Sequence, residues 1–158
     1  MKTTAIITES SPITGTEVNQ NDGTPHGALV QFYAAFNGRD LNLMEQNWLQ
    51  SPESAMDNPL GGIMRGWENI AQVYRRIFEG QAQVYVEFYD YSIHEQGDSF
   101  FAVGRERGQF TVNGLTINLA IRTSRIFKKE NGKWEQVHHH GSIEDPTLLA
   151  EYQRLVKG

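Results

Sequence analysis

Cysteine is absent from the 158-residue chain, which excludes disulfide bonds and thiol chemistry. Long apolar runs are absent too: no stretch approaches the roughly 18 apolar residues of a membrane-spanning helix. Near the N-terminus, the apolar run Ala5–Ile6–Ile7 is too short for the core of a signal peptide. We therefore expect a cytoplasmic protein that does not contact a membrane.

An excess of positive charge is also missing, since the formal net charge is -5. Binding to a phosphate backbone needs a basic face, so nucleic acid is not expected as a partner. The composition, with 39% apolar and 21% charged residues, is that of an average globular protein. Residues 1–22 are rich in Thr, Ser, Asn and Gly and predict a flexible N-terminal arm, while residues 23–158 predict a single domain.

Helical patterns fill the first half of this domain. Thr24–Pro25 is typical of a helix start and Asn37–Gly38 of a helix end. A shorter helix follows Asp40 as its cap, and a third lies between Gly66 and Gly80. The first and third helices each carry an apolar stripe at helical spacing. The stripes are Leu29, Phe32, Tyr33 and Phe36, and Ile70, Val73, Tyr74, Ile77 and Phe78.

Strand patterns fill the second half, in four runs at about 83–95, 99–112, 115–129 and 133–143. Short loops separate the runs, and Asn113–Gly114 is a strong hairpin signal, so neighbouring strands should be antiparallel. A short helix follows Asp145–Pro146. The order predicts an α+β fold, with three N-terminal helices packed on a strongly curved antiparallel sheet and a short C-terminal helix.

The segment Trp134–Ser142, WEQVHHHGS, is the most informative stretch. Strict alternation along a strand would put His138 and His140 on one face, together with Trp134, and would turn His139 to the other face. Two imidazoles beside an apolar wall suggest the floor of a cavity.

The turn at 129–132 decides which residues of the preceding strand join this face. A type I turn with a glycine bulge pairs Lys129 with Lys133 and brings Arg122 and Ser124 beside the two histidines. A two-residue turn brings Thr123 and Arg125 in instead. We favour the bulged turn.

The helical segments, the motif Asp57–Asn58–Pro59 and the final hairpin together resemble the SnoaL-like branch of the nuclear-transport-factor-2-like superfamily. The most specific part of the resemblance is Arg122–x–Ser124, Gly132–x–Trp134 and His138–x–His140–x–Ser142. It covers about residues 24–156. The resemblance implies a cone of three helices and a curved sheet, which pairs into a homodimer through the sheet.

The resemblance also implies a pocket lined by the first helix, the segment after the second helix and the last two strands. Carried over to this chain, the pocket residues are Tyr33, Trp48, Asp57, Arg122, His138 and His140. The family includes isomerases, cyclases and dehydratases as well as oligomerising domains without chemistry, so the fold alone does not fix the function.

Each predicted site residue has a functional and a structural interpretation. His138 and His140 would exchange a proton, or would be hydrogen-bonded core histidines. Asp57 would orient an imidazole, or would begin a turn. Arg122 would hold negative charge on a ligand, or would balance a carboxylate of the protein. Zinc would need a third ligand beside the two histidines, for which only Asp57 is at hand, so no metal is expected.

Two hypotheses follow. The first is a cofactor-free isomerase, dehydratase or cyclase that moves a proton on a small hydrophobic or carboxylate-bearing carbonyl compound. In this hypothesis His138, His140 and Asp57 are catalytic, and Arg122, Tyr33 and Trp48 bind the ligand. The second is a non-catalytic ligand-binding or oligomerisation module with the same fold.

Overall fold

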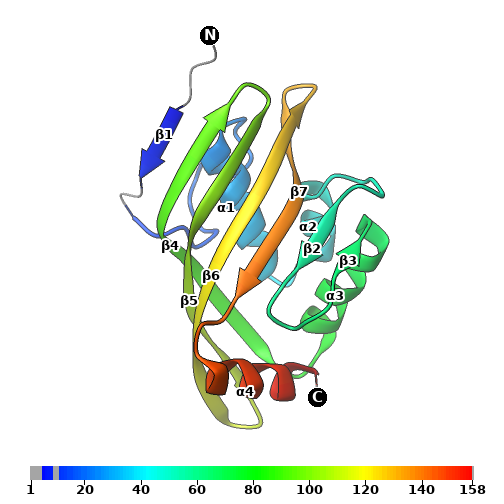
Figure 1. Cartoon of the computed structure of the whole chain (residues 1–158), viewed down its shortest axis with the longest axis vertical. Coiled ribbons are helices and arrows are strands. Elements are labelled where there is room, and N and C mark those ends of the chain that lie inside the picture. The colour runs from blue at the N-terminus through cyan, green and yellow to red at the C-terminus, as the bar shows by residue number, and fades with distance from the viewer. Residues whose placement is uncertain (1–4, 9–10, 158) are drawn as a thin grey trace.

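The computed structural model describes residues 5–8 and 11–157 of the chain (Figure 1). The helices are α1 (Pro25–Asn37), α2 (Leu41–Asn47), α3 (Trp67–Glu79) and α4 (Pro146–Lys157). The strands are β1 (Ala5–Thr8), β2 (Ala55–Asp57), β3 (Met64–Arg65), β4 (Gln83–Gln96), β5 (Ser99–Val112), β6 (Leu115–Glu130) and β7 (Lys133–Ser142). The predicted α+β class is confirmed.

The described strands form one sheet in the order β1-β4-β5-β6-β7-β2-β3. Strands β4 to β7 make the predicted antiparallel meander, and the Asn113–Gly114 turn pairs Arg105 with Arg122 as the two-residue turn requires. The sheet is mixed, however, because the short strand β2 runs parallel to β7. This pairing brings Asp57 beside His140 in the ladder.

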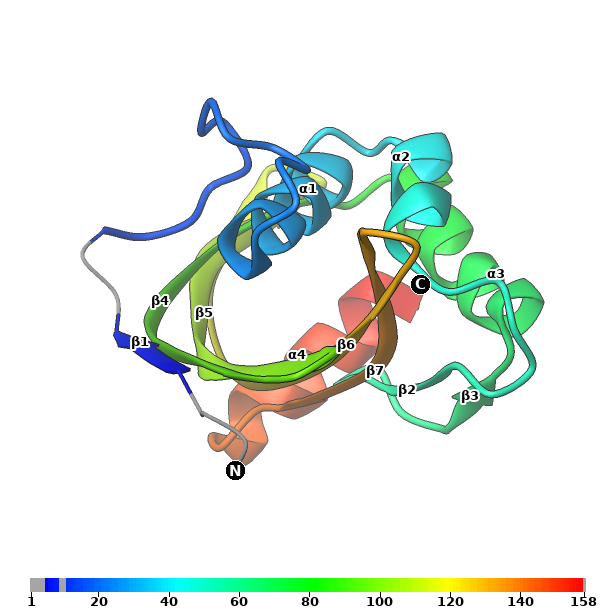
Figure 2. The same ribbon diagram turned by 90° about the horizontal axis from the view of Figure 1, so that it is seen from above.

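The sheet curves around α1, α2 and α3, which cover its inner face (Figure 2). The predicted apolar stripes of α1 and α3 point into this space, where Leu29, Tyr33 and Ile70 are fully buried. The curved sheet needs a glycine on β5 opposite the bulge of β4. A Cβ atom on Gly104 would lie 2.6 Å from Cβ of Tyr91.

Local sequence explains how the helices and hairpins begin and end. The side chain of Thr24 accepts a hydrogen bond from the Gly27 amide at the start of α1, and Asp40 accepts one from Leu43 at the start of α2. In the last hairpin, Asn131 (φ 55°) and Gly132 (φ 78°) both adopt the left-handed conformation of a two-residue turn.

The favoured register of that hairpin is therefore wrong. Glu130 pairs with Lys133, which is the two-residue alternative. A bulge occurs instead inside β7, since Phe127 pairs with Gln136 but Ile126 pairs with His138 and leaves Val137 as the extra residue. The extra residue reverses the alternation, so that Trp134 and Gln136 face inward before the bulge and His139 faces inward after it.

Part of the predicted N-terminal arm packs on the cone. Ile13 is fully buried and exchanges two backbone hydrogen bonds with Phe88 of β4, at 2.8 and 2.9 Å. Asn37 of α1 donates to the Thr14 carbonyl. Residues 1–4 and 9–10 of the arm, and residue 158, lie outside the described residues.

Within the described ranges 5–8 and 11–157, every helix is too short or too polar to cross a membrane.

Candidate functional site

A buried ion pair lies in the space between the sheet and the helices. Nη2 of Arg125 on β6 is 3.1 Å from Oε2 of Glu106 on β5, and the two side chains are only 2% and 7% exposed. The hydroxyl of Tyr33, from α1, donates to the same carboxylate oxygen at 2.6 Å. Because an uncompensated charge at this depth would be costly, the three groups depend on one another.

The network continues from Arg125 towards the helices. Nη1 of Arg125 donates to Gln136 Oε1 at 2.8 Å, and Gln136 Nε2 donates to Asn47 Oδ1 at 2.9 Å. Asn47, on α2, in turn donates to Gln31 Oε1 and to the Ala28 carbonyl of α1. The polar chain therefore joins the sheet to the first two helices.

The electrostatics of this network fix its protonation. Burial raises the pKa of Tyr33, and the Glu106 charge raises it further, so the phenol keeps its proton and donates. Burial acts to lower the pKa of Arg125, but Tyr33 and Glu106 outweigh it and raise that pKa. The guanidinium also lies 3.6 Å from the ring centroid of Phe32, a cation–π contact.

His139 is the one inward-facing imidazole of β7. Its Nε2 lies 2.6 Å from the Thr123 hydroxyl, and its buried Nδ1 has no hydrogen-bond partner. Burial lowers the pKa of His139 well below its ordinary value of 6.5, and the positive charge of Arg125 lowers it further, so the ring is neutral. Close packing surrounds it, since a side chain on Gly141 would lie 3.2 Å from Nε2.

His139 and the ion pair share one small cavity of about 40 Å³. Its walls come from α1, α3, the segment after β2, the sheet and α4. The lining residues are Phe32, Phe36, Asn58, Pro59, Tyr74, Ile77, Val84, Val86, Glu106, Ile121, Arg125, His139 and Tyr152. Arg125 Nε is buried without a hydrogen-bond partner, like His139 Nδ1. An apolar lining with a few polar groups has the chemistry of a small-molecule site, but this cavity is far smaller than the roughly 300–1,000 Å³ of most ligand pockets.

Tyr74 adds a phenol to this cavity. Burial raises the pKa of Tyr74 to about 12, so its hydroxyl is protonated. The hydroxyl and the indole N–H of Trp48 form no hydrogen bond of ordinary geometry, although the two rings lie 6.4 Å apart. Trp48 is fully buried between Tyr74 and Trp67 and does not line the cavity.

The prediction that His138 and His140 face this cavity is wrong, because the bulge at Val137 turns them to the outer face of the sheet. There Nδ1 of His140 is 2.7 Å from Asp57 Oδ2, and Nδ1 of His138 is 3.0 Å from the Ala55 carbonyl. Asp57 does hold an imidazole, as one of its two interpretations predicts. It does so with side chains that are 53% and 35% exposed for His140 and Asp57.

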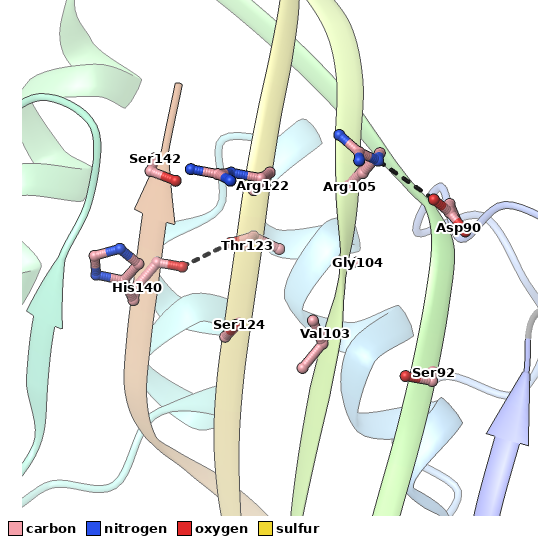
Figure 3. A pocket seen from close by; sticks show the side chains of 10 residues that line it. All are labelled: Asp90, Ser92, Val103, Gly104, Arg105, Arg122, Thr123, Ser124, His140 and Ser142. Carbon is pink, nitrogen blue, oxygen red and sulfur yellow. Dashed lines mark hydrogen bonds and ion pairs between the residues drawn. The ribbon is translucent and has the colours of Figure 1, made fainter. Parts of the chain in front are cut away.

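Arg122 is also misplaced by the favoured register and lies on the outer face. Figure 3 shows it reaching towards Ser142, within a groove of about 500 Å³ that His140, Arg105 and Asp90 also line. Glu144 lies 3.3 Å from both Arg122 and Arg105, so protein carboxylates balance these cations. Within the described residues there is no group of three metal-binding side chains.

Of the predicted site residues, Tyr33 alone reaches the cavity network. Sequence reasoning missed Glu106, Arg125, Gln136 and His139. The sequence held a signal for two of these residues. The two-residue alternative for the turn between β6 and β7 puts Arg125 on the inner face, and the Asn113–Gly114 turn pairs Glu106 with the apolar Ile121.

The comparisons with known proteins agree with the fold. A model of the SnoaL-like domain matches residues 27–146, and no curated protein matches the chain. The chain is similar to a provisionally named calcium/calmodulin-dependent protein kinase type II association domain from Thiobacillus denitrificans. The two are 27% identical, with 77% of this chain and 96% of that chain covered and a TM-score of 0.64.

Two further solved structures are similar. A nuclear transport factor 2-like superfamily protein from Salmonella enterica is 25% identical, with 76% of this chain and 88% of that chain covered and a TM-score of 0.66. A ketosteroid isomerase-like protein from Erwinia carotovora atroseptica is 21% identical, with 75% and 92% covered and a TM-score of 0.62. The last likeness shows the fold alone.

Proposed function

The chain belongs to the SnoaL-like domain family, and we propose that its cavity binds a small uncharged carbonyl compound and moves a proton through His139. The observation that supports this is the pairing of two unsatisfied atoms in one enclosure, Nδ1 of His139 and Nε of Arg125. One can accept a proton, and the other can donate a hydrogen bond to an oxygen.

Thr123 sets the form of the imidazole. Its hydroxyl lies 3.3 Å from the His140 carbonyl, to which it can donate, and 2.6 Å from His139 Nε2. When the hydroxyl donates to the carbonyl, it accepts from Nε2–H, and Nδ1 is left with a free lone pair. A neutral ring with this tautomer is a base at neutral pH.

The reaction follows from these roles. His139 Nδ1 takes a proton from the carbon next to the ligand carbonyl, the electron pair of that C–H bond forms a carbon–carbon double bond, and the π pair of the carbonyl moves to its oxygen. Arg125 Nε–H and the Tyr74 hydroxyl are donors for the developing negative charge. In a ligand with a carbon–carbon double bond next to the deprotonated carbon, return of the proton from His139 to the far carbon of that double bond, as the π pair returns to the carbonyl, completes an isomerisation. An uncharged ligand fits because Glu106 already balances Arg125.

Proton exchange tests this proposal directly. Acetone, butanone and cyclopentanone are screened for binding by thermal shift, and loss of their α-hydrogens in D₂O is then followed by proton NMR. We expect His139→Gln to abolish protein-dependent exchange, since its amide can still contact Thr123 but offers no base. His140→Gln, on the outer face, is the matched control and should keep the exchange. Unchanged exchange in His139→Gln would refute the role of His139.

A second function, a non-catalytic assembly module, is supported by the small free volume of the interior. Tyr33, Glu106, Arg125 and Gln136 form hydrogen bonds with one another, and little space is left beside them. The likeness to a provisionally named association domain points the same way. In this case the outer sheet face would be the working surface and would pair with a second copy. No thermal shift from any compound, together with a stable dimer, would favour the module.

A further inference from the structure

Helix α4 closes one end of the cavity and begins where the family match ends. The SnoaL-like match stops at residue 146, and α4 spans Pro146–Lys157. In Figure 2, α4 lies at the far end of the space that the sheet and the other helices enclose. The closing wall of the cavity is therefore a segment outside the matched domain.

Two side chains of α4 contact the cavity walls, and Leu148, Leu149, Leu155 and Val156 of the same helix pack against the core. Tyr152 is 5% exposed, lines the cavity and packs its ring 5.4 Å from the ring of Phe110. Gln153 Nε2 donates to the Pro59 carbonyl at 3.0 Å. Because Pro59 and Asn58 line the cavity as well, this hydrogen bond joins two of its walls.

Helix α4 has its own N-terminal cap. Asp145 caps it through its side chain, which accepts from the amides of Thr147 and Leu148. These bonds are internal to α4 and its cap, so they survive if the helix pivots about the exposed residues 144–145. The sheet walls, in contrast, are held by continuous ladders. Compared with these sheet walls, α4 can open at lower cost.

The closed cavity is too small for an organic ligand, so a ligand could enter only if a wall opened. About 40 Å³ holds only a few waters, whereas a benzene-sized guest occupies a cavity on the order of 150 Å³. We propose that α4 is a lid over the cavity, with Tyr152 as its plug and the Gln153–Pro59 hydrogen bond as its latch. This inference concerns access and goes beyond the proposed function, because it holds for a catalytic and a non-catalytic pocket alike.

The absence of cysteine allows a direct test in the full-length protein. Ile77 lines the cavity and is 7% exposed, so Ile77→Cys introduces a single thiol there, and iodoacetamide should reach it faster when the lid opens. Loss of one hydrogen bond should raise the open population, so Gln153→Ala should speed labelling about two- to tenfold. Tyr152→Ala should speed it more. If Ile77→Cys does not fold, Val84→Cys probes the same cavity.

Two controls separate lid opening from unfolding. Ile93→Cys is the same substitution at a fully buried site that does not line the cavity, so its labelling reports global unfolding. Arg154→Ala changes an exposed neighbour of Gln153 on the same helix and should leave all rates unchanged. Equal acceleration at Ile93→Cys and Ile77→Cys, or no acceleration at either, would overturn the proposal.

Discussion

At the scale of single residues, the buried pair of Glu106 and Arg125 dominates the energetics of the interior. Glu106→Gln removes the negative charge and leaves a guanidinium that is 2% exposed without compensation. Loss of one partner of a buried pair typically costs about 3–5 kcal/mol. We expect a decrease of about 3 kcal/mol or more in the free energy of unfolding, measured by urea denaturation.

The matched control is Glu87→Gln, which removes the partner of Arg107 on the outer face. That pair is shorter, at 2.6 Å, but its side chains are 50% and 23% exposed for Arg107 and Glu87. Solvent screens such a pair, so the change should stay within about 1 kcal/mol. Equal losses for the two variants would mean that burial does not make the Glu106 pair special.

His139 makes stability depend on pH. Its pKa is near 6.5 when unfolded and well below that when folded, so above pH 6.5 both states are neutral and stability is complete. As the pH falls below 6.5, the unfolded state binds one more proton, and stability is lost by up to about 1.4 kcal/mol per pH unit until the folded pKa is reached. The measurement is a series of urea denaturations between pH 7 and 5.

Substitution of the ring isolates its contribution. The side chain of His139→Gln cannot titrate, so the unfolding free energy of this variant should fall less steeply over the same pH range. The difference between the two slopes should correspond to about one bound proton. His138→Gln removes an outward-facing ring and should leave the contribution of His139 in place. An identical slope in the wild type and in His139→Gln would show that His139 is not buried as a neutral ring.

At the scale of elements, local patterns predicted the helices well. The stripes of α1 and α3 have the spacing of a helix, and Thr24 and Asp40 cap the helices where expected, because such signals depend on neighbours within one turn. The meander followed in the same way from its short loops. The family resemblance stated from these motifs is confirmed by the domain match.

The site could not be predicted as well, because it depends on the bulge at Val137. A bulge is set by how two strands pair over their whole length, and a single extra residue turns every later side chain to the opposite face. Strict alternation from Trp134 is right as far as Gln136 and wrong from His138 onward. The wrong prediction for the turn between β6 and β7 put Arg122 on the inner face in place of Arg125.

The two-residue turn of the last hairpin can be tested by itself. Gly132 has φ 78°, so Gly132→Ala forces a side chain into the left-handed region and should cost about 1–2 kcal/mol of unfolding free energy. Asn131 is also left-handed, so Asn131→Gly relieves the cost of a side chain at that position and should leave the free energy of unfolding unchanged or slightly higher. Thermal denaturation of both variants is the measurement. Tolerance of alanine at 132 would speak against this turn.

At the scale of the whole molecule, the described residues leave an apolar part of the outer sheet face exposed. Phe101 and Ile126 are cross-strand partners on this face and are 45% and 37% exposed, and Val103 beside them is 43% exposed. The ring of Phe101 stacks on His94 at 4.4 Å. A contiguous apolar patch flanked by arginines and carboxylates is typical of a protein interface.

The expected homodimer can be tested on this patch. A second copy that covers Phe101 and Ile126 would bury the apolar area and set the cations of one copy near the carboxylates of the other. We expect sedimentation at twice the chain mass at micromolar concentration, and a shift to the monomer in Phe101→Glu and Ile126→Glu, because each buries a charge in the interface. Val18→Glu is the matched control, since Val18 is fully exposed and belongs to the segment before α1 rather than to the sheet. A wild-type monomer, or a dimer that survives both sheet variants, would exclude this face as the interface.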